Sequence, residues 1–142
     1  MDHDCPSCTA GRKAIRPTVF DTLKAYIGLI TIDLLIKLGG FPLLYRTIKR
    51  RTVSEINPAA PWEIERICAA ADKAGRYYFK HALCLQRSAL IAFLLRRRGI
   101  PATMVIGCRI MPYQGHAWVE VEGRVVSDKP EVQQFYQVLE RV

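Results

Sequence analysis

The chain has 142 residues, of which 50% are apolar and 24% charged, so it suits one folded domain and is too apolar for a disordered chain. Its net charge of +8 admits an acidic peptide, an anionic membrane surface or nucleic acid as a partner. That charge comes with no recognition motif for nucleic acid, no basic stripe interleaved with aromatic residues and no zinc finger. Nucleic acid is therefore not an expected partner.

Cysteine usage indicates a reducing compartment. The five cysteines are odd in number and unevenly spaced, which argues against a disulfide framework. The first residues are acidic where a secretory signal would be basic, so we expect a cytoplasmic protein. Cys5 and Cys8 form a CxxC pair, but no second ligand pair follows at the spacing of a zinc site. We predict no metal and treat residues 1–19 as a loose tail.

Two helices are predicted next. Apolar periodicity indicates a first helix over residues 20–38, which Gly39 ends, and a short second helix over 42–52. The first apolar run is shorter than the roughly 20 residues of a membrane span. It also carries Asp33 and Lys37, whose spacing lets them pair on one helix face. We favour a packed amphipathic helix, and attachment to a membrane surface or a membrane-bound partner is the open alternative.

The second helix ends in a basic cluster: Arg46, Lys49, Arg50 and Arg51. Cations at a helix C-terminus suit the macrodipole, so this cluster needs no ligand, and recognition of an acidic peptide is the alternative. Pro58 and Pro61 then punctuate the chain. We place a boundary there, with a tail and helical arm over residues 1–58 and the main domain over 59–142.

The main domain changes from helical to extended periodicity. Helices are predicted over 61–78 and 84–98, and the second is apolar on nearly all sides, as a central buried helix is. Strands are predicted over 102–110 and 116–121, and residues 124–126 begin a partner strand that carries Asp128. Residues 130–142 close the chain as a short helix or an extended cover. Helices followed by a small antiparallel sheet make an α+β domain.

Three residues on these elements have the chemistry of a nucleophile and its partners. Cys84 starts the buried helix, where unpaired N–H groups and the helix dipole lower the pKa of a thiol. His116 lies on the next-to-last predicted strand and lowers that pKa further if it is an imidazolium. Asp128 would hold this imidazole in the required tautomer. The backbone N–H of Cys84 also suits an oxyanion, and none of these roles needs a cofactor.

One strand pairing would bring Asp128 directly opposite His116. The two residues face each other directly if Glu120 pairs with Arg124, which requires a three-residue loop over 121–123 or an equivalent bulge. A two-residue loop would turn Asp128 to the other face of the sheet. We therefore predict the three-residue loop or an equivalent bulge.

Three further residues are expected to contact the substrate: Trp118, Gln86 and Arg87. Trp118 shares the strand face of His116, so we also expect it to shield the site from water. Taken singly, each catalytic residue has a simpler explanation. A cysteine before a leucine-rich helix is more often a small buried hydrophobic residue than a nucleophile. A histidine in a strand is usually a polar residue with its hydrogen bonds satisfied, and Asp128 could cap the C-terminal segment. Only their combination in this order favours catalysis.

Several stretches of the main domain follow one another in a specific order. They are Cys84-Leu85-Gln86-Arg87-Ser88, Leu94-Leu95-Arg96-Arg97-Arg98-Gly99, Val105-Ile106-Gly107, His116-Ala117-Trp118-Val119-Glu120, and Gly123 with Asp128. With them, residues 60–142 resemble the transglutaminase-like leader peptidases of lasso-peptide biosynthesis. The resemblance implies a papain- or transglutaminase-like core, with Cys84 as nucleophile, His116 as general base and acid, and Asp128 as the orienting acid. It implies hydrolysis of one peptide bond, which frees the leader from a ribosomally made precursor.

The same resemblance implies partners. Leader recognition in that family often lies in a small winged-helix-like protein, and residues 1–58 are too short and too helical to be it. We therefore expect a separate leader-binding protein, the precursor leader as substrate, and an ATP-dependent macrolactam-forming cyclase that acts next. Two alternatives stay open. One is an acyl transferase on the same three residues, because attack by water or by an amine follows one thioester, and the other is a catalytically silent peptide-binding scaffold.

Overall fold

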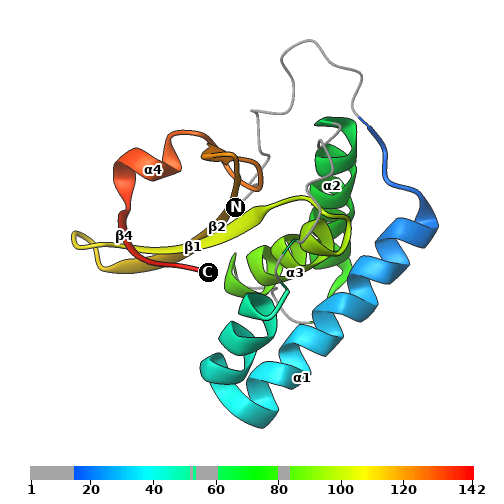
Figure 1. Cartoon of the computed structure of the whole chain (residues 1–142), viewed down its shortest axis with the longest axis horizontal. Coiled ribbons are helices and arrows are strands. Elements are labelled where there is room, and N and C mark those ends of the chain that lie inside the picture. The colour runs from blue at the N-terminus through cyan, green and yellow to red at the C-terminus, as the bar shows by residue number, and fades with distance from the viewer. Residues whose placement is uncertain (1–14, 52, 54–60, 80–83) are drawn as a thin grey trace.

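In the part of the chain that the structure describes, three helices precede a four-stranded antiparallel sheet (Figure 1). The computed structural model describes residues 15–51, 53, 61–79 and 84–142. In chain order the elements are α1 (Val19–Lys49), α2 (Pro61–Tyr77), α3 (Cys84–Arg97), β1 (Ala102–Arg109), β2 (Gln114–Val121), β3 (Arg124–Val125), α4 (Val132–Phe135) and β4 (Gln137–Arg141). The predicted α+β order is confirmed, and the elements over 61–121 begin and end within two residues of their predicted bounds. β3 is shorter than predicted, because it ends before Asp128.

α1 begins at a capping box and is interrupted once. The side chains of Thr18 and Asp21 each accept from the other's backbone N–H, and Arg66 of α2 adds a bidentate ion pair to Asp21 at 2.8 and 2.9 Å. Gly40 leaves helical geometry with φ 64° and ψ −166°, a region that only glycine adopts readily, and Pro42 follows it. The helix axis therefore bends where the sequence predicts that one helix ends and another begins.

The inner face of α1 belongs to the same hydrophobic core as α2 and α3. Leu29 and Ile32 of α1 are at most 4% exposed and share one buried cluster with Ala71 of α2 and Leu90 of α3. α3 lies between the other two helices and the sheet, and it contacts all of them (Figure 1). The predicted arm thus packs on the predicted main domain, while the boundary proposed near residue 58 lies outside the described residues.

The sheet has the strand order β3-β2-β1-β4, with every neighbouring pair antiparallel. One face carries Met104 and Val119, which belong to the core that contains α3. The other face carries Val105 and Trp118, which form a second buried cluster with Val132 of α4. β1 and β2 are therefore covered on both faces, and β2 runs through the interior beside α3.

β2 and β3 are joined by a two-residue turn, and the predicted three-residue loop is wrong. Val121 pairs with Arg124, and the residues between them, Glu122 and Gly123, have φ values of 52° and 76°. Two consecutive positive φ values give a turn whose twist matches that of the flanking strands, so this tight connection is favourable. The prediction assumed that Asp128 reaches the site while paired in the ladder, and β3 ends before Asp128.

Candidate active site

Cys84 is the first residue of α3 and lies where this helix meets β2. The N–H groups in the first turn of a helix have no intrahelical acceptor. The backbone N–H groups of Leu85 and Ala117 hydrogen-bond to the Cys84 sulfur. One turn along α3, the buried hydroxyl of Ser88 donates to the carbonyl of Ala117 at 2.9 Å. Contacts from both elements therefore fix the half-buried sulfur at their junction.

The charges of Cys84 and His116 support each other. A hydrogen bond with His116 is the main effect that lowers the pKa of Cys84, and burial opposes it. The pKa of His116 is raised from 6.5 to about 9, mainly by Asp128 and next by Cys84. A lowered thiol pKa and a raised imidazole pKa both favour a thiolate beside an imidazolium. This ion pair exists from the lowered pKa of the thiol up to about pH 9.

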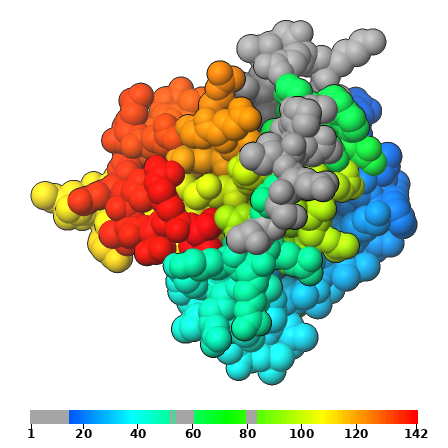
Figure 2. Space-filling model, viewed as in Figure 1, coloured from blue at the N-terminus to red at the C-terminus, as the bar shows by residue number. Residues whose placement is uncertain are grey.

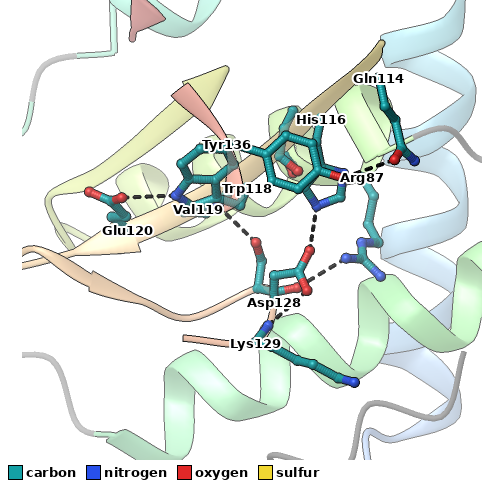
Figure 3. Close-up of polar contacts among 12 residues, drawn as sticks. Arg87, Gln114, His116, Trp118, Val119, Glu120, Asp128, Lys129 and Tyr136 are labelled. Atoms are coloured by element: carbon teal, nitrogen blue, oxygen red, sulfur yellow. Dashed lines mark hydrogen bonds and ion pairs between the residues drawn. The ribbon is translucent and has the colours of Figure 1, made fainter. Parts of the chain in front are cut away.

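Asp128 completes the series of contacts. Its Oδ2 lies 2.6 Å from Nε2 of His116 (Figure 3). Burial opposes ionisation of Asp128, but the hydrogen bond from His116 and other contacts lower its pKa, so the group is a carboxylate. With Nε2 engaged by an acceptor, Nδ1 is the ring nitrogen left to exchange a proton with Cys84. The structure thus brings together the three residues that the sequence singles out, and their catalytic roles stay predictions.

Asp128 reaches His116 from a segment that has left the sheet. The hydroxyl of Ser127 accepts from the backbone N–H of Val119 at 2.8 Å, so a side chain takes the place of the next ladder bond. Asp128 then accepts from the N–H of Lys129 at 2.7 Å through Oδ1, which leaves Oδ2 for the imidazole. This departure from the ladder reconciles the tight turn with the contact between Asp128 and His116.

Arg87 holds the same segment from α3. Its guanidinium donates to the carbonyl of Ser127 at 3.0 Å and to Oδ1 of Asp72 in α2, also at 3.0 Å. We expected Arg87 to contact the substrate, but its described partners are internal. It joins α2, α3 and the residue before Asp128, so its position supports the orientation of the acid.

Gln86 points away from the site that was expected for it. It is 9% exposed, and its Nε2 donates to Oδ1 of Asp33 in α1 at 2.9 Å. Two residues apart on a helix, side chains point to nearly opposite sides, so Gln86 faces away from Cys84. This hydrogen bond connects α3 to α1, and the position of Gln86 does not support the expected contact with substrate.

Trp118 lies behind the imidazole. Its ring is stacked on His116 with centroids 6.2 Å apart, and its indole N–H donates to Glu120 at 2.8 Å. Glu120 is itself 3% exposed and accepts further hydrogen bonds from Gln133 and Arg141 at 2.8 and 2.6 Å. Trp118 has no exposed surface, so it covers one face of the His116 ring from the interior and offers no area for direct substrate contact.

Tyr136 is a site residue that sequence reasoning missed. Its ring centroid lies 5.1 Å from that of His116, and its hydroxyl donates to Gln114 at 3.2 Å (Figure 3). The chain folds back after α4 to place this ring over the imidazole. Only the expectation that residues 130–142 form a cover pointed in this direction. No spacing in the sequence singles out the tyrosine.

A separate cleft of about 620 Å³ lies between α1, α2 and the C-terminal half of α3. Its walls include Ile27, Phe93 and Arg97. A helix rises 1.5 Å per residue, so Arg97 lies about 20 Å along α3 from Cys84, and the cleft is not the reaction site. Among the described residues, no group of three or more His, Cys, Asp and Glu side chains could hold a metal ion. The Cys5/Cys8 pair lies outside those residues.

Comparison with known proteins connects this geometry to a family. The sequence profile of the transglutaminase-like superfamily matches residues 28–141, from the middle of α1 to the end of β4. The microcin J25-processing protein McjB of Escherichia coli is 37% identical over 59 residues, which are 42% of this chain and 28% of that protein. The match thus spans little more than a quarter of the relative. No solved structure matches the chain.

Proposed function

This chain belongs to the transglutaminase-like superfamily, and on that premise we propose that it is a cysteine peptidase that removes the leader from a lasso precursor peptide. The observation that carries the proposal is the series of contacts from Cys84 through His116 to Asp128, with the thiol pKa lowered and the imidazole pKa raised. The similarity to a protein named for microcin processing supports a ribosomally made peptide as the substrate.

The first half-reaction forms a thioester. The thiolate of Cys84 attacks the scissile carbonyl carbon, and the electron pair of the C=O bond moves to oxygen. The backbone N–H of Cys84, at the start of α3, is suited to stabilise this oxyanion. As the C–N bond breaks, the imidazolium of His116 gives its Nδ1 proton to the departing amine. The core peptide leaves with a new amino terminus, and the leader stays bound to sulfur.

The second half-reaction restores the enzyme. Nδ1 of His116, now neutral, takes a proton from water while the water oxygen attacks the thioester carbonyl. The C–S bond breaks, the leader leaves as a carboxylic acid, and the thiolate faces an imidazolium again. Asp128 compensates the charge on the imidazolium and keeps Nδ1 directed at the sulfur. One water is consumed for each peptide bond that is cleaved.

The partners follow from the same proposal. The leader of the precursor peptide is the substrate, and a separate winged-helix-like protein presents it. An ATP-dependent cyclase then forms the macrolactam on the freed core peptide. We place these steps in the cytoplasm, where the thiols of Cys68, Cys84 and Cys108, which form no disulfide in the described part of the chain, stay reduced.

The test is reconstitution of cleavage with a precursor peptide and its leader-binding protein, followed by mass spectrometry. We expect two products whose masses sum to that of the precursor plus one water, and we expect Cys84→Ala to abolish them. Cys108→Ala is the matched control and keeps the activity, because Cys108 belongs to β1 and has no place in the proposed mechanism. Cleavage by Cys84→Ala at the normal rate would refute the proposal. A product joined to an added amine, with no water gained, would identify an acyl transferase instead.

A further inference from the structure

The outward face of α1 carries an unusual number of exposed apolar side chains. Six of them, spaced three or four residues apart, form one stripe along the helix between its start and Gly40. The outer stripe consists of Phe20, Leu23, Ile27, Ile30, Leu34 and Leu38, which are between 44% and 75% exposed. Figure 2 shows α1 along the margin of the molecule. Patches of this kind on a soluble domain mark a surface that binds something apolar.

The fold excludes a transmembrane course for α1 as long as the domain stays folded. By length and composition α1 could cross a membrane. Its other face, however, lies in the core, where Leu29 is 1% exposed and Asp33 is hydrogen-bonded to Gln86 of α3. Because one face of α1 is packed in protein, only its outer face can contact lipid.

Charged side chains around the outer stripe are basic. With 100° per residue, Lys24 and Lys37 fall on opposite sides of the stripe. Both are exposed, and Lys37 also pairs with Asp33 at 3.5 Å. The acids of α1 are Asp21 and Asp33, and both are held by internal partners, Asp21 by Arg66. The stripe therefore presents apolar groups bordered by positive charge.

We propose that α1 docks this domain on an anionic membrane surface, with the outer stripe in the boundary between headgroups and acyl chains. Two features favour lipid over a protein partner. The stripe is aliphatic apart from Phe20 and lacks the Trp, Tyr and Arg anchors of protein interfaces. Its borders are lysines, which protein interfaces disfavour and which anionic headgroups attract. The net charge of +8 for the whole chain acts in the same direction.

The experiment is co-sedimentation of the full chain with lipid vesicles. One set is pure phosphatidylcholine, and the other is an equimolar mixture of phosphatidylcholine and phosphatidylglycerol. We expect binding to the anionic vesicles that high salt weakens. The double variant Ile27→Gln/Leu34→Gln should bind at least tenfold more weakly. Lys24→Glu should lower the affinity by about fivefold or more, because each basic residue near such a surface contributes about that factor.

The matched control is Phe135→Gln/Leu139→Gln, which removes two apolar side chains of similar exposure from α4 and β4. These residues are 61% and 60% exposed, against 56% and 52% for Ile27 and Leu34. We expect the control to bind vesicles like the unchanged chain, and all variants to keep their thermal unfolding midpoints.

Three outcomes would overturn the proposal. They are no binding to anionic vesicles, equal loss of binding in the control variant, and self-association in ultracentrifugation that Ile27→Gln/Leu34→Gln abolishes. The last result would assign the stripe to a second copy of the chain. The vesicle assay involves no cleavage, so its result is independent of the proposed peptidase activity.

Discussion

Replacing Asp128 with asparagine separates the charge of this residue from its shape. The carboxylate now satisfies two groups at once, since Oδ2 lies 2.6 Å from His116 Nε2 and Oδ1 accepts from the N–H of Lys129 at 2.7 Å. Asparagine has a single acceptor oxygen. If that oxygen stays with Lys129, the amide N–H₂ faces Nε2 and selects the tautomer with its proton on Nδ1. Such an imidazole is unable to accept the proton of the Cys84 thiol.

The magnitude follows from the pKa of His116, which stands at about 9 against an ordinary 6.5. Complete reversal of this rise would correspond to roughly 3 kcal/mol, at 1.36 kcal/mol per pKa unit. Cys84 supplies part of the rise, and solvent screens the partly exposed ring. We therefore expect Asp128→Asn to reduce the free energy that favours the thiolate–imidazolium pair by about 1–2 kcal/mol. This loss lowers the population of the ion pair by about 5- to 30-fold.

The sign of the pH dependence is fixed. Without the carboxylate the imidazole loses its proton at lower pH, so the alkaline limit of the ion pair moves down from about 9. The thiol loses part of its imidazolium partner, so its pKa rises and the acidic limit moves up. The pH window of activity should narrow from both sides.

The assay is alkylation of Cys84 by iodoacetamide as a function of pH, with the modified residue located by mass spectrometry. It reports the thiolate without any substrate, and the rate of precursor cleavage provides the second measurement. Glu131→Gln is the matched control, because it removes the same charge from an exposed position in the same segment. An Asp128→Asn protein with unchanged pH profiles for both alkylation and cleavage would refute the assigned role.

Three other substitutions test the supports of the site. Arg87→Met removes the donor to the Ser127 carbonyl and the ion pair with Asp72 of α2. We expect the free energy of unfolding, measured by urea denaturation, to fall by about 1–2 kcal/mol and precursor cleavage to slow. Gly107→Ala would put a Cβ 2.9 Å from the Trp118 ring, so we expect a loss of about 1–3 kcal/mol and a changed tryptophan emission. Gly40→Ala meets a φ of 64°, and its cost of about 1–3 kcal/mol should appear as a lower denaturation midpoint, whereas an unchanged midpoint would show that α1 straightens freely.

The types and order of the elements could be predicted because they depend on local patterns. The change of period at Pro101, the glycines that end helices and the apolar character of α3 are all properties of short stretches. The three candidate catalytic residues could be named only partly for the same reason. Cys84 starts a predicted helix and His116 lies on a predicted strand, whereas Asp128 lies beyond the end of β3. The break at Gly40 belongs here too, because its cause lies in two adjacent glycines and a following proline.

Contacts between side chains across the fold could not be predicted from such short stretches. Gln86 and Arg87 are neighbours of Cys84 in sequence, but the helical period turns them to Asp33 and to Ser127, and no local pattern contains those partners. The loop after β2 was derived by assuming that the ladder continues to Asp128. It ends early because the Ser127 side chain replaces a backbone partner, which periodicity does not reveal.

The site therefore depends on both ends of the described chain as well as on its middle. α1 holds the first turn of α3 through Asp33 and Gln86, and the segment after α4 places Tyr136 over the imidazole. The Cys84 sulfur is hydrogen-bonded to Ala117 and His116 of β2. A shift of α3 relative to the sheet would therefore separate the sulfur from His116. A thiolate–imidazolium pair gains strength only while its partners stay in place and partly shielded from water. The distant contacts of α1 and the C-terminal segment thus set the geometry on which the pKa values of Cys84 and His116 depend.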